Sequence, residues 1–169
     1  VDIIEEVARI YGYHNLPSKL MDTTIPTTYP EKVNFVIEDK IKHFLSNIGC
    51  QEIYSYSLVS EEIAVKSGHS ASQHLRLQNP LTDDKVYLRR SLLPSLEEII
   101  DDNPQQKKLS VFEMANTYTP QEDSDLPHEK LELGFVSTTE YRLVRGILES
   151  LLDQLFIRNY EIVDHKKTT

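Results

Sequence analysis

Apolar residues recur every three to four positions in several stretches of the chain, which is the spacing of an amphipathic helix. These stretches predict helices over residues 2–11, about 31–48, a short segment after Ser60, about 92–102 and about 140–156. Gly12 and Gly49 lie where the first two helices should end, and Pro94 falls in a first helical turn, where proline is tolerated. The last helix carries the widest apolar stripe, Leu143–Leu155, so we expect this stripe to lie in the core.

Apolar and polar residues alternate in other stretches, which is the period of a strand. The predicted strands are residues 51–58, a short one at Leu75–Leu77, 109–115 with 117–119 extending it or pairing beside it, 131–135, and one around Tyr160–Ile162. Residues 13–30 contain three prolines and little periodicity, which favours an extended linker and a domain boundary. The order of helices and strands predicts an α+β domain with an antiparallel sheet covered by helices.

Composition and charge exclude several classes of protein. The 169 residues include 18 basic and 27 acidic side chains, and the resulting net charge of −9 has the wrong sign for a general nucleic-acid binder. We expect no membrane span, because no apolar run approaches the roughly 20 residues that a bilayer requires. The single Cys50 excludes an internal disulfide and favours a cytoplasmic location. The N-terminus has no signal-peptide pattern and opens inside a helix without Met, so we expect a piece of a larger protein.

One acidic cluster has the spacing of a candidate metal site. Asp2, Glu5 and Glu6 lie three and four positions apart, so a helix brings their carboxylates to one side, where oxygen ligands suit a hydrated Mg²⁺. The alternative is structural: acidic residues in a first turn stabilise the helix dipole, and Glu5 can pair with Arg9. The phosphate-binding, zinc and hydrolase motifs that would indicate an active site are not found in the sequence.

Arginine and tyrosine residues form two further candidate sites. Arg89 and Arg90, beside a predicted helix start, suit a phosphate or a partner's carboxylate, although a solvated strand end is the alternative. Tyrosines at strand spacing stack on bases in some proteins and pack in cores or interfaces in others. The tyrosines concerned are Tyr54, Tyr56 and Tyr118.

Several longer motifs, taken together and in order, resemble one family. The matching segments are residues 2–13 (DIIEEVARIYGY), 48–53 (IGCQEI), 77–82 (LQNPLT), 88–96 (LRRSLLPSL), 111–118 (VFEMANTY) and 145–149 (RGILE). They are similar to the end of the domain before the core, and to the core itself, in the bacterial phenylalanine–tRNA ligase β-subunit family. The resemblance covers nearly the whole chain.

This resemblance implies a fold and an assembly. The fold is a class II aminoacyl-tRNA synthetase-like antiparallel sheet flanked by helices, with residues 1–20 as the remnant and linker of a preceding metal-binding domain and residues 21–169 as the core. The assembly contains two α and two β subunits: the α subunits bind ATP and phenylalanine and perform the reaction, and tRNA binds through the full complex. The β core is inactive. Residues 109–121 agree, since they lack the arginine that class II active sites use to hold ATP phosphates.

The resemblance also bears on the metal. The family's β subunit binds Mg²⁺ through an acidic pattern that matches Asp2, Glu5 and Glu6, with a further ligand upstream, so the site here is incomplete. Two alternatives to the scaffold function stay open. One is a free-standing class II-like, ATP-dependent ligase in which Arg89 or Arg90 replaces the missing arginine, and the other is a generic protein-interaction domain.

Overall fold

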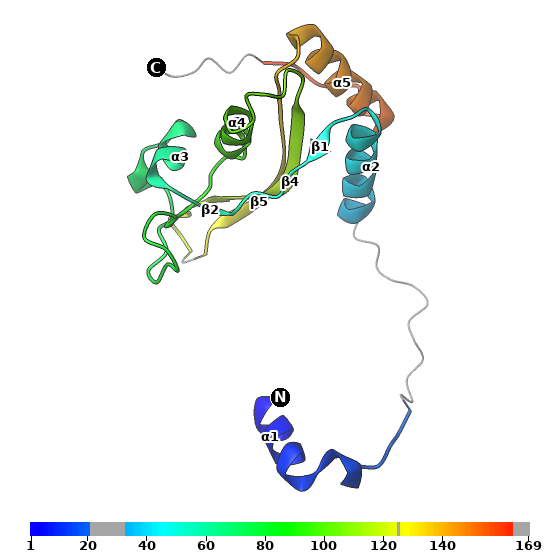
Figure 1. Ribbon diagram of the computed structural model, residues 1–169, viewed down its shortest axis with the longest axis vertical. Helices are drawn as coiled ribbons and strands as arrows, with labels where there is room; N and C mark the ends of the chain where they lie inside the picture. Colours follow the sequence, from blue (N-terminus) through cyan, green and yellow to red (C-terminus); the bar gives the residue numbers. More distant parts are fainter. Residues whose placement is uncertain (21–32, 125, 164–169) are drawn as a thin grey trace. The chain divides into compact units, whose positions relative to one another are not determined.

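The computed structural model describes residues 1–20, 33–124 and 126–163 (Figure 1). The contacts within the chain divide it into two units, Val1–Glu31 and Lys32–Thr169. The sequence predicted a division after residue 20, and the residues between that position and the observed division lie outside the described ones. No helix in the described ranges has both the length and the apolar character needed to cross a bilayer.

The first unit contains helix α1 (Asp2–Tyr11), which matches the prediction from the sequence, and a short 3₁₀ helix, η1 (Tyr13–Asn15). Gly12 ends α1 with a φ of 90°, a conformation that glycine adopts at little cost, and its N–H donates to the carbonyl of Ala8. No residue of α1 is buried within the described structure. The apolar face that the sequence predicts is therefore exposed in this unit, with Ile3 and Ile10 about 80% accessible.

The second unit is built on a long strand pair. Strand β4 (Ser110–Thr119) is antiparallel to β5 (His128–Ser137) along its whole length, from Ser110 opposite Ser137 to Thr119 opposite His128. On its other side β4 pairs in parallel with the short β1 (Gln51–Glu52), which gives the order β1-β4-β5. A second, two-stranded sheet joins β2 (Leu58–Val59) to β3 (Tyr87–Leu88) in antiparallel fashion.

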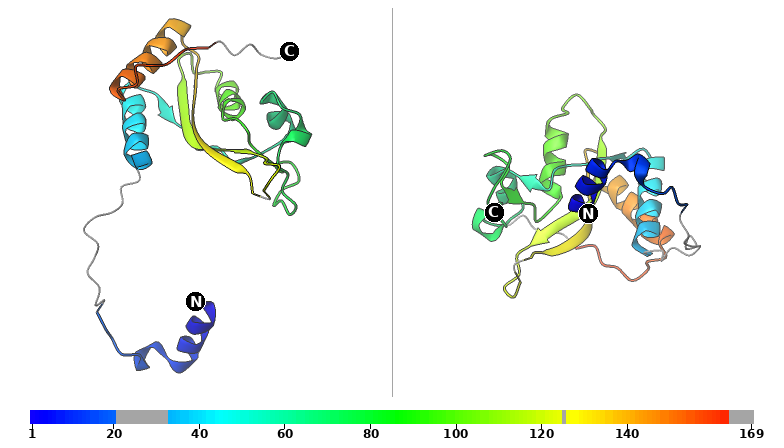
Figure 2. Two further views of the ribbon diagram at one scale, coloured as in Figure 1. Left: turned by 180° about the vertical axis from the view of Figure 1, so that it is seen from behind. Right: turned by 90° about the horizontal axis from the view of Figure 1, so that it is seen from below.

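Helices cover both faces of the three-stranded sheet (Figures 1 and 2). The helices of this unit are α2 (Val33–Asn47), α3 (Glu61–Lys66), the 3₁₀ helix η2 (Ala71–Gln73), α4 (Leu93–Asp101) and α5 (Tyr141–Gln154). Because side chains alternate along a strand, Phe112 of β4 packs with Leu45 of α2 and Leu151 of α5, whereas Val111 packs with Leu96 of α4 on the opposite face. The sheet therefore has a hydrophobic core on each side.

The fold corrects several expectations from the sequence. The predicted single strand 51–58 is wrong. The chain forms β1 in the large sheet, and the Ile53 N–H donates to the Phe112 carbonyl at 2.8 Å. Beyond Ile53 it leaves this sheet and enters the small sheet as β2. The predicted strand around Tyr160–Ile162 is also wrong, since residues 158–163 form no regular element. Near Leu75–Leu77 the structure has a single bridge, from Arg76 to Tyr87. The predicted core stripe on α5 is only partly buried, since Leu143 is 56% exposed.

Candidate functional site

A buried ion pair lies between β3 and the middle of β4. Arg89 directly follows β3, and its Nη1 lies 3.1 Å from Oε1 of Glu113 in β4. The two side chains are only 3% and 2% exposed. Burying two charges is costly unless each is paired and hydrogen-bonded, so the surroundings of this pair decide whether it is stable.

Hydrogen bonds with Ser55 and with the backbone of β4 complete the pair. The Ser55 backbone N–H and hydroxyl donate to the two carboxylate oxygens of Glu113 at 3.1 and 2.7 Å. Arg89 Nη1 also donates to the Ser55 hydroxyl at 2.8 Å, and Arg89 Nε donates to the Asn116 carbonyl at 3.0 Å. The guanidinium that sequence analysis offered for phosphate binding is therefore directed at acceptors inside the protein.

Arg90 points elsewhere. Its Nη1 donates to the Gln73 carbonyl at 2.9 Å, at the end of η2, and its Nε is buried without a partner among the described residues. The structure thus separates the roles of the two adjacent arginines, because one lies in the core and the other holds the loop before β3. Burial lowers the pKa of His69, which lies between α3 and η2, and the nearby charge of Arg90 lowers it further.

The acidic residues of α1 lie on an exposed helix that also carries Arg9. Arg9 pairs with Glu6, its Nε lying 3.1 Å from the carboxylate, rather than with Glu5 as the helical spacing predicted. Within residues 1–20 and the rest of the described chain, no group of three or more His, Cys, Asp or Glu side chains is placed to hold a metal ion. The metal site at Asp2, Glu5 and Glu6 therefore stays a prediction from the family.

The two strand-spaced tyrosines lie on the surface between β1 and β2. Tyr54 and Tyr56 are 78% and 77% exposed, so they do not belong to the core of this chain. The Lys42 ammonium lies 5.5 Å from the ring centre of Tyr54, and that of Lys85 lies 5.3 Å from the ring centre of Tyr56. Cations at this distance are attracted by the ring faces. The third tyrosine, Tyr118, is half-buried in β4.

An ion pair connects this surface to α2. Lys42 Nζ lies 2.7 Å from Oε1 of Glu52, and each side chain is about one quarter exposed. Burial raises the pKa of Glu52, but hydrogen bonds from Lys42 and Tyr54 and the positive charge of Lys42 lower it further than burial raises it. The bond to Glu52 raises the pKa of Lys42 against the opposing effect of burial.

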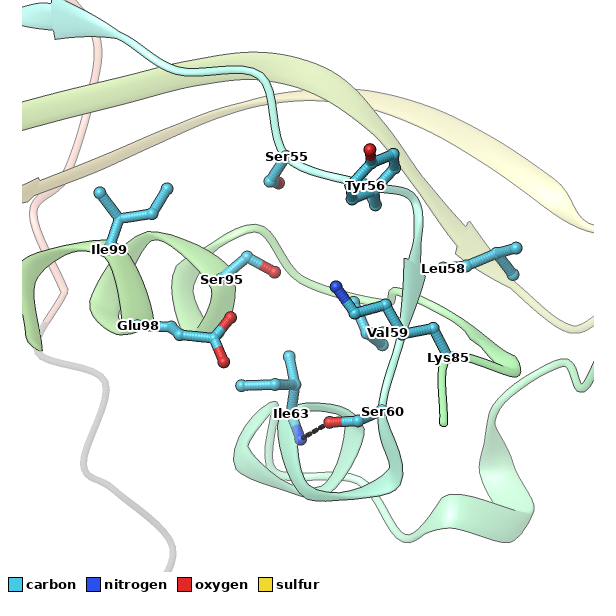
Figure 3. A pocket seen from close by; sticks show the side chains of 10 residues that line it. All are labelled: Ser55, Tyr56, Leu58, Val59, Ser60, Ile63, Lys85, Ser95, Glu98 and Ile99. Atoms are coloured by element: carbon cyan, nitrogen blue, oxygen red, sulfur yellow. Dashed lines mark hydrogen bonds between the residues drawn. The ribbon is translucent and has the colours of Figure 1, made fainter. Parts of the chain in front are cut away.

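A small pocket lies between α3, α4 and the segment that leads into β2 (Figure 3). Its volume is about 120 Å³, and the Lys85 ammonium and Glu98 carboxylate point into it above Ile63. Sequence reasoning missed this pocket, because its residues come from segments that only the fold brings together. Pockets that bind drug-sized ligands measure roughly 300–1,000 Å³, so this one is too small for a nucleotide.

The chain is similar in sequence to one family of known proteins. Residues 16–169 match the family model described as the phenylalanyl tRNA synthetase beta chain CLM domain. The chain is 34% identical over 94% of its length to the phenylalanine–tRNA ligase β subunit of Carboxydothermus hydrogenoformans, and 31% identical over 94% to that of Bacillus cereus strain ZK. In both cases the matched region is 22% of the relative's length, so the chain spans about a fifth of these relatives.

Solved structures support the fold. A pyrrolysyl-tRNA synthetase from Desulfitobacterium hafniense, PylSc, superposes with a TM-score of 0.62 at 19% identity, over 77% of this chain and 48% of that one. An ATP phosphoribosyltransferase regulatory subunit/histidyl-tRNA synthetase from Bacillus halodurans superposes with a TM-score of 0.58 at 18% identity, over 82% of this chain and 39% of that one. These likenesses bear out the class II synthetase-like fold predicted from the sequence.

Proposed function

We propose that this chain is the non-catalytic core of a phenylalanine–tRNA ligase β subunit, because it belongs to the family of phenylalanyl-tRNA synthetase β-chain CLM domains. In this proposal the α subunit binds ATP and phenylalanine and carries out the reaction. The chain's own task is to hold the α subunit and a second β subunit in an α₂β₂ assembly, and tRNA is bound by that assembly.

The burial of Arg89 and its pairing with Glu113 are the observation that carries the proposal. A site that activates an amino acid with ATP needs uncompensated positive charge where the phosphates develop negative charge. Arg89 is 3% exposed, and its charge is matched by Glu113. Redirecting it to a ligand would leave the Glu113 carboxylate buried and unpaired, which costs several kcal/mol. The arrangement thus favours a scaffold over an ATP site.

Mg²⁺ binding belongs to the same proposal only in the complete subunit. Its support is the likeness of Asp2, Glu5 and Glu6 to the acidic pattern of the family. With Glu6 paired to Arg9, at least one further oxygen ligand from outside α1 is needed to complete a site.

Co-expression with the cognate α subunit tests the function. We expect the two chains to elute together in size-exclusion chromatography. Isothermal titration of ATP–Mg²⁺ into the chain without the α subunit should give no binding heat. Micromolar ATP binding by this chain would favour the free-standing ligase, and failure to associate with the α subunit would favour a generic interaction domain.

A second test compares the aminoacylation rate of the unaltered complex with that of a complex carrying one matched variant. Arg90 is only partly buried and its guanidinium bonds one loop carbonyl, so Arg90→Gln should leave the fold intact. If catalysis resides in the α subunit, Arg90→Gln changes the aminoacylation rate by less than about twofold. A loss of ~100-fold, the size expected for a removed phosphate-binding group, would place the chemistry on this chain.

A further inference from the structure

The small pocket of Figure 3 contains a buried polar group that the fold itself does not use; we call it the Ser95 pocket. Of the serines that line it, Ser55 bonds through its hydroxyl to the buried ion pair, and Ser60 caps α3. Ser95 of α4 is only 6% exposed, yet among the described residues its hydroxyl has no hydrogen-bond partner. Figure 3 shows this hydroxyl directed into the pocket. A buried hydroxyl without a partner is costly, so the position indicates a ligand.

Two opposite charges reach into the pocket without meeting. Lys85 lies two residues before β3 and Glu98 lies in α4, and Figure 3 shows their charged groups on either side of the pocket. Among the described residues neither takes part in an ion pair. The Lys85 ammonium lies 5.3 Å from the ring centre of Tyr56, which attracts it to one wall. Lys66, a cation that Glu98 influences, is already paired with Glu62 at 3.0 Å.

This pair of charges restricts the chemistry of the ligand. A simple anion that binds Lys85 also meets the carboxylate of Glu98, and a simple cation that binds Glu98 meets the ammonium of Lys85. Like charges brought together are unfavourable, so the pocket discriminates against both kinds of ion. A compact zwitterion fits, because each of its charges faces the opposite charge on the wall. The free α-amino acid is such a zwitterion, since one carbon carries both its ammonium and its carboxylate.

The size and the apolar part of the pocket restrict the side chain of that amino acid. The volume of about 120 Å³ corresponds to roughly four water molecules at about 30 Å³ each. Glycine and alanine are of this size, whereas phenylalanine is much larger. Val59 and Ile63 are buried and, with Ile99, form the apolar part of the lining. Apolar surface of this kind favours the methyl group of alanine.

We propose that the Ser95 pocket binds a small α-amino acid of the size of alanine as its zwitterion. The carboxylate of the ligand accepts hydrogen bonds from Lys85 and Ser95, its ammonium donates to Glu98, and its methyl group contacts Ile63. The inference does not rest on the proposed function, because every residue of the pocket belongs to this chain and none depends on a partner subunit.

Binding of L-alanine to the complete chain tests the proposal. A ligand this small can bind only weakly, so isothermal titration should give a dissociation constant of about 1 mM. At a tenfold excess over that constant, the melting temperature should rise by about 3–6 °C, because the ligand binds only the folded chain. Acetate and ethylamine, which each carry one of the two charges, should bind at least about tenfold more weakly at the same ionic strength, and L-phenylalanine should not bind.

Three variants of α4 identify the site. Ser95→Ala and Glu98→Gln should each weaken L-alanine binding by about tenfold, because each removes one polar partner of the ligand. Glu98→Gln should also improve the binding of acetate relative to L-alanine, a change of selectivity that a loss of stability cannot produce. Glu97→Gln is the matched control: it makes the same change on the neighbouring exposed residue, outside the pocket lining, and should alter affinity by less than about twofold.

Three outcomes would overturn the proposal. The first is that L-alanine gives neither heat nor a change of melting temperature at about 100 mM, which is far above the expected constant. The second is that acetate binds the unaltered chain as tightly as L-alanine, which would indicate a plain anion site. The third is that Ser95→Ala and Glu98→Gln bind L-alanine as the Glu97→Gln control does, which would place the ligand elsewhere. None of these outcomes bears on association with the α subunit, so the proposed function is tested separately.

Discussion

Arg89 and Glu113 illustrate how single residues shape this molecule. Each charged group is held by backbone or hydroxyl groups from neighbouring segments as well as by its partner. Such pairs contribute little when compared with a well-packed apolar pair, yet removing one member leaves the other charge buried. The pair therefore fixes the segment around Ser55 against β4 rather than supplying a large net stabilisation.

We predict that Arg89→Met lowers the free energy of unfolding by about 3–5 kcal/mol, because the Glu113 carboxylate loses its buried counter-charge. The double variant Arg89→Met/Glu113→Leu should recover most of this loss, since it leaves no charge in the site. Urea denaturation of the three proteins measures both values. A single variant within ~1 kcal/mol of the unaltered chain would show that the pair does not carry a buried charge.

The Lys42–Glu52 pair predicts a pH dependence of stability. The pKa of Glu52 is lowered from 4.5 in the folded state. Glu52 therefore stabilises the fold above pH 4.5, and this stabilisation is lost as the pH falls through the lower pKa of the folded state. The pKa of Lys42 is raised from 10.5, so its contribution is present below that value and is lost as the pH rises through the higher folded pKa. Thermal melts from pH 3 to 8 should therefore show a smaller acid-side loss in Glu52→Gln. An unchanged acid-side slope in Glu52→Gln would contradict the assignment.

At the scale of elements, α4 approaches β5 closely because Gly134 has no side chain. A Cβ at this position would lie 2.9 Å from Leu92 Cβ and 2.9 Å from Leu96 Cδ1, closer than such atoms approach in folded proteins. Gly134→Ala should therefore destabilise the chain by about 1–3 kcal/mol through overpacking. Gly146→Ala is the matched control: it adds the same methyl group to open space in a helix and should stabilise by up to ~1 kcal/mol. Equal melting temperatures for the two variants would contradict this account of the packing.

The elements that the sequence predicted well are those with local signals. Three such signals act within one helical turn: the glycine that ends a helix at Gly12, the cap at Ser60 and the first-turn proline at Pro94. The Ser60 hydroxyl, for example, accepts a hydrogen bond from Ile63 N–H at 3.3 Å. The long strands β4 and β5 also follow the alternation in the sequence.

The errors come from contacts between distant segments. Residues 51–58 alternate as one strand does, but Ser55 bonds to a side chain 58 residues away and the segment divides between two sheets. Arg89 was identified as a candidate, yet its role depends on Glu113, 24 residues further along. Leu143 fits the core pattern, but it borders a groove instead. Periodicity predicts which face is apolar, and only tertiary structure decides what covers it.

At the scale of the whole molecule, the division into two units predicts independent stability. Helix α1 has ten residues and buries none of them, and helices this short are marginal in water without packing. The second unit has its own core on both faces of the sheet. Deleting Val1–Glu31 should therefore shift the melting temperature of the remaining chain by less than about 2 °C, a change that corresponds to well under 1 kcal/mol.

The control for this deletion lies in the core of the second unit. Leu45 of α2 is fully buried, so Leu45→Ala should cost about 2–5 kcal/mol and lower the melting temperature by several degrees in both the complete and the shortened chain. Equal losses in the two backgrounds mean that the first unit adds nothing to the core of the second. A deletion that lowers the melting temperature as far as Leu45→Ala does would instead show that α1 packs on the second unit in solution.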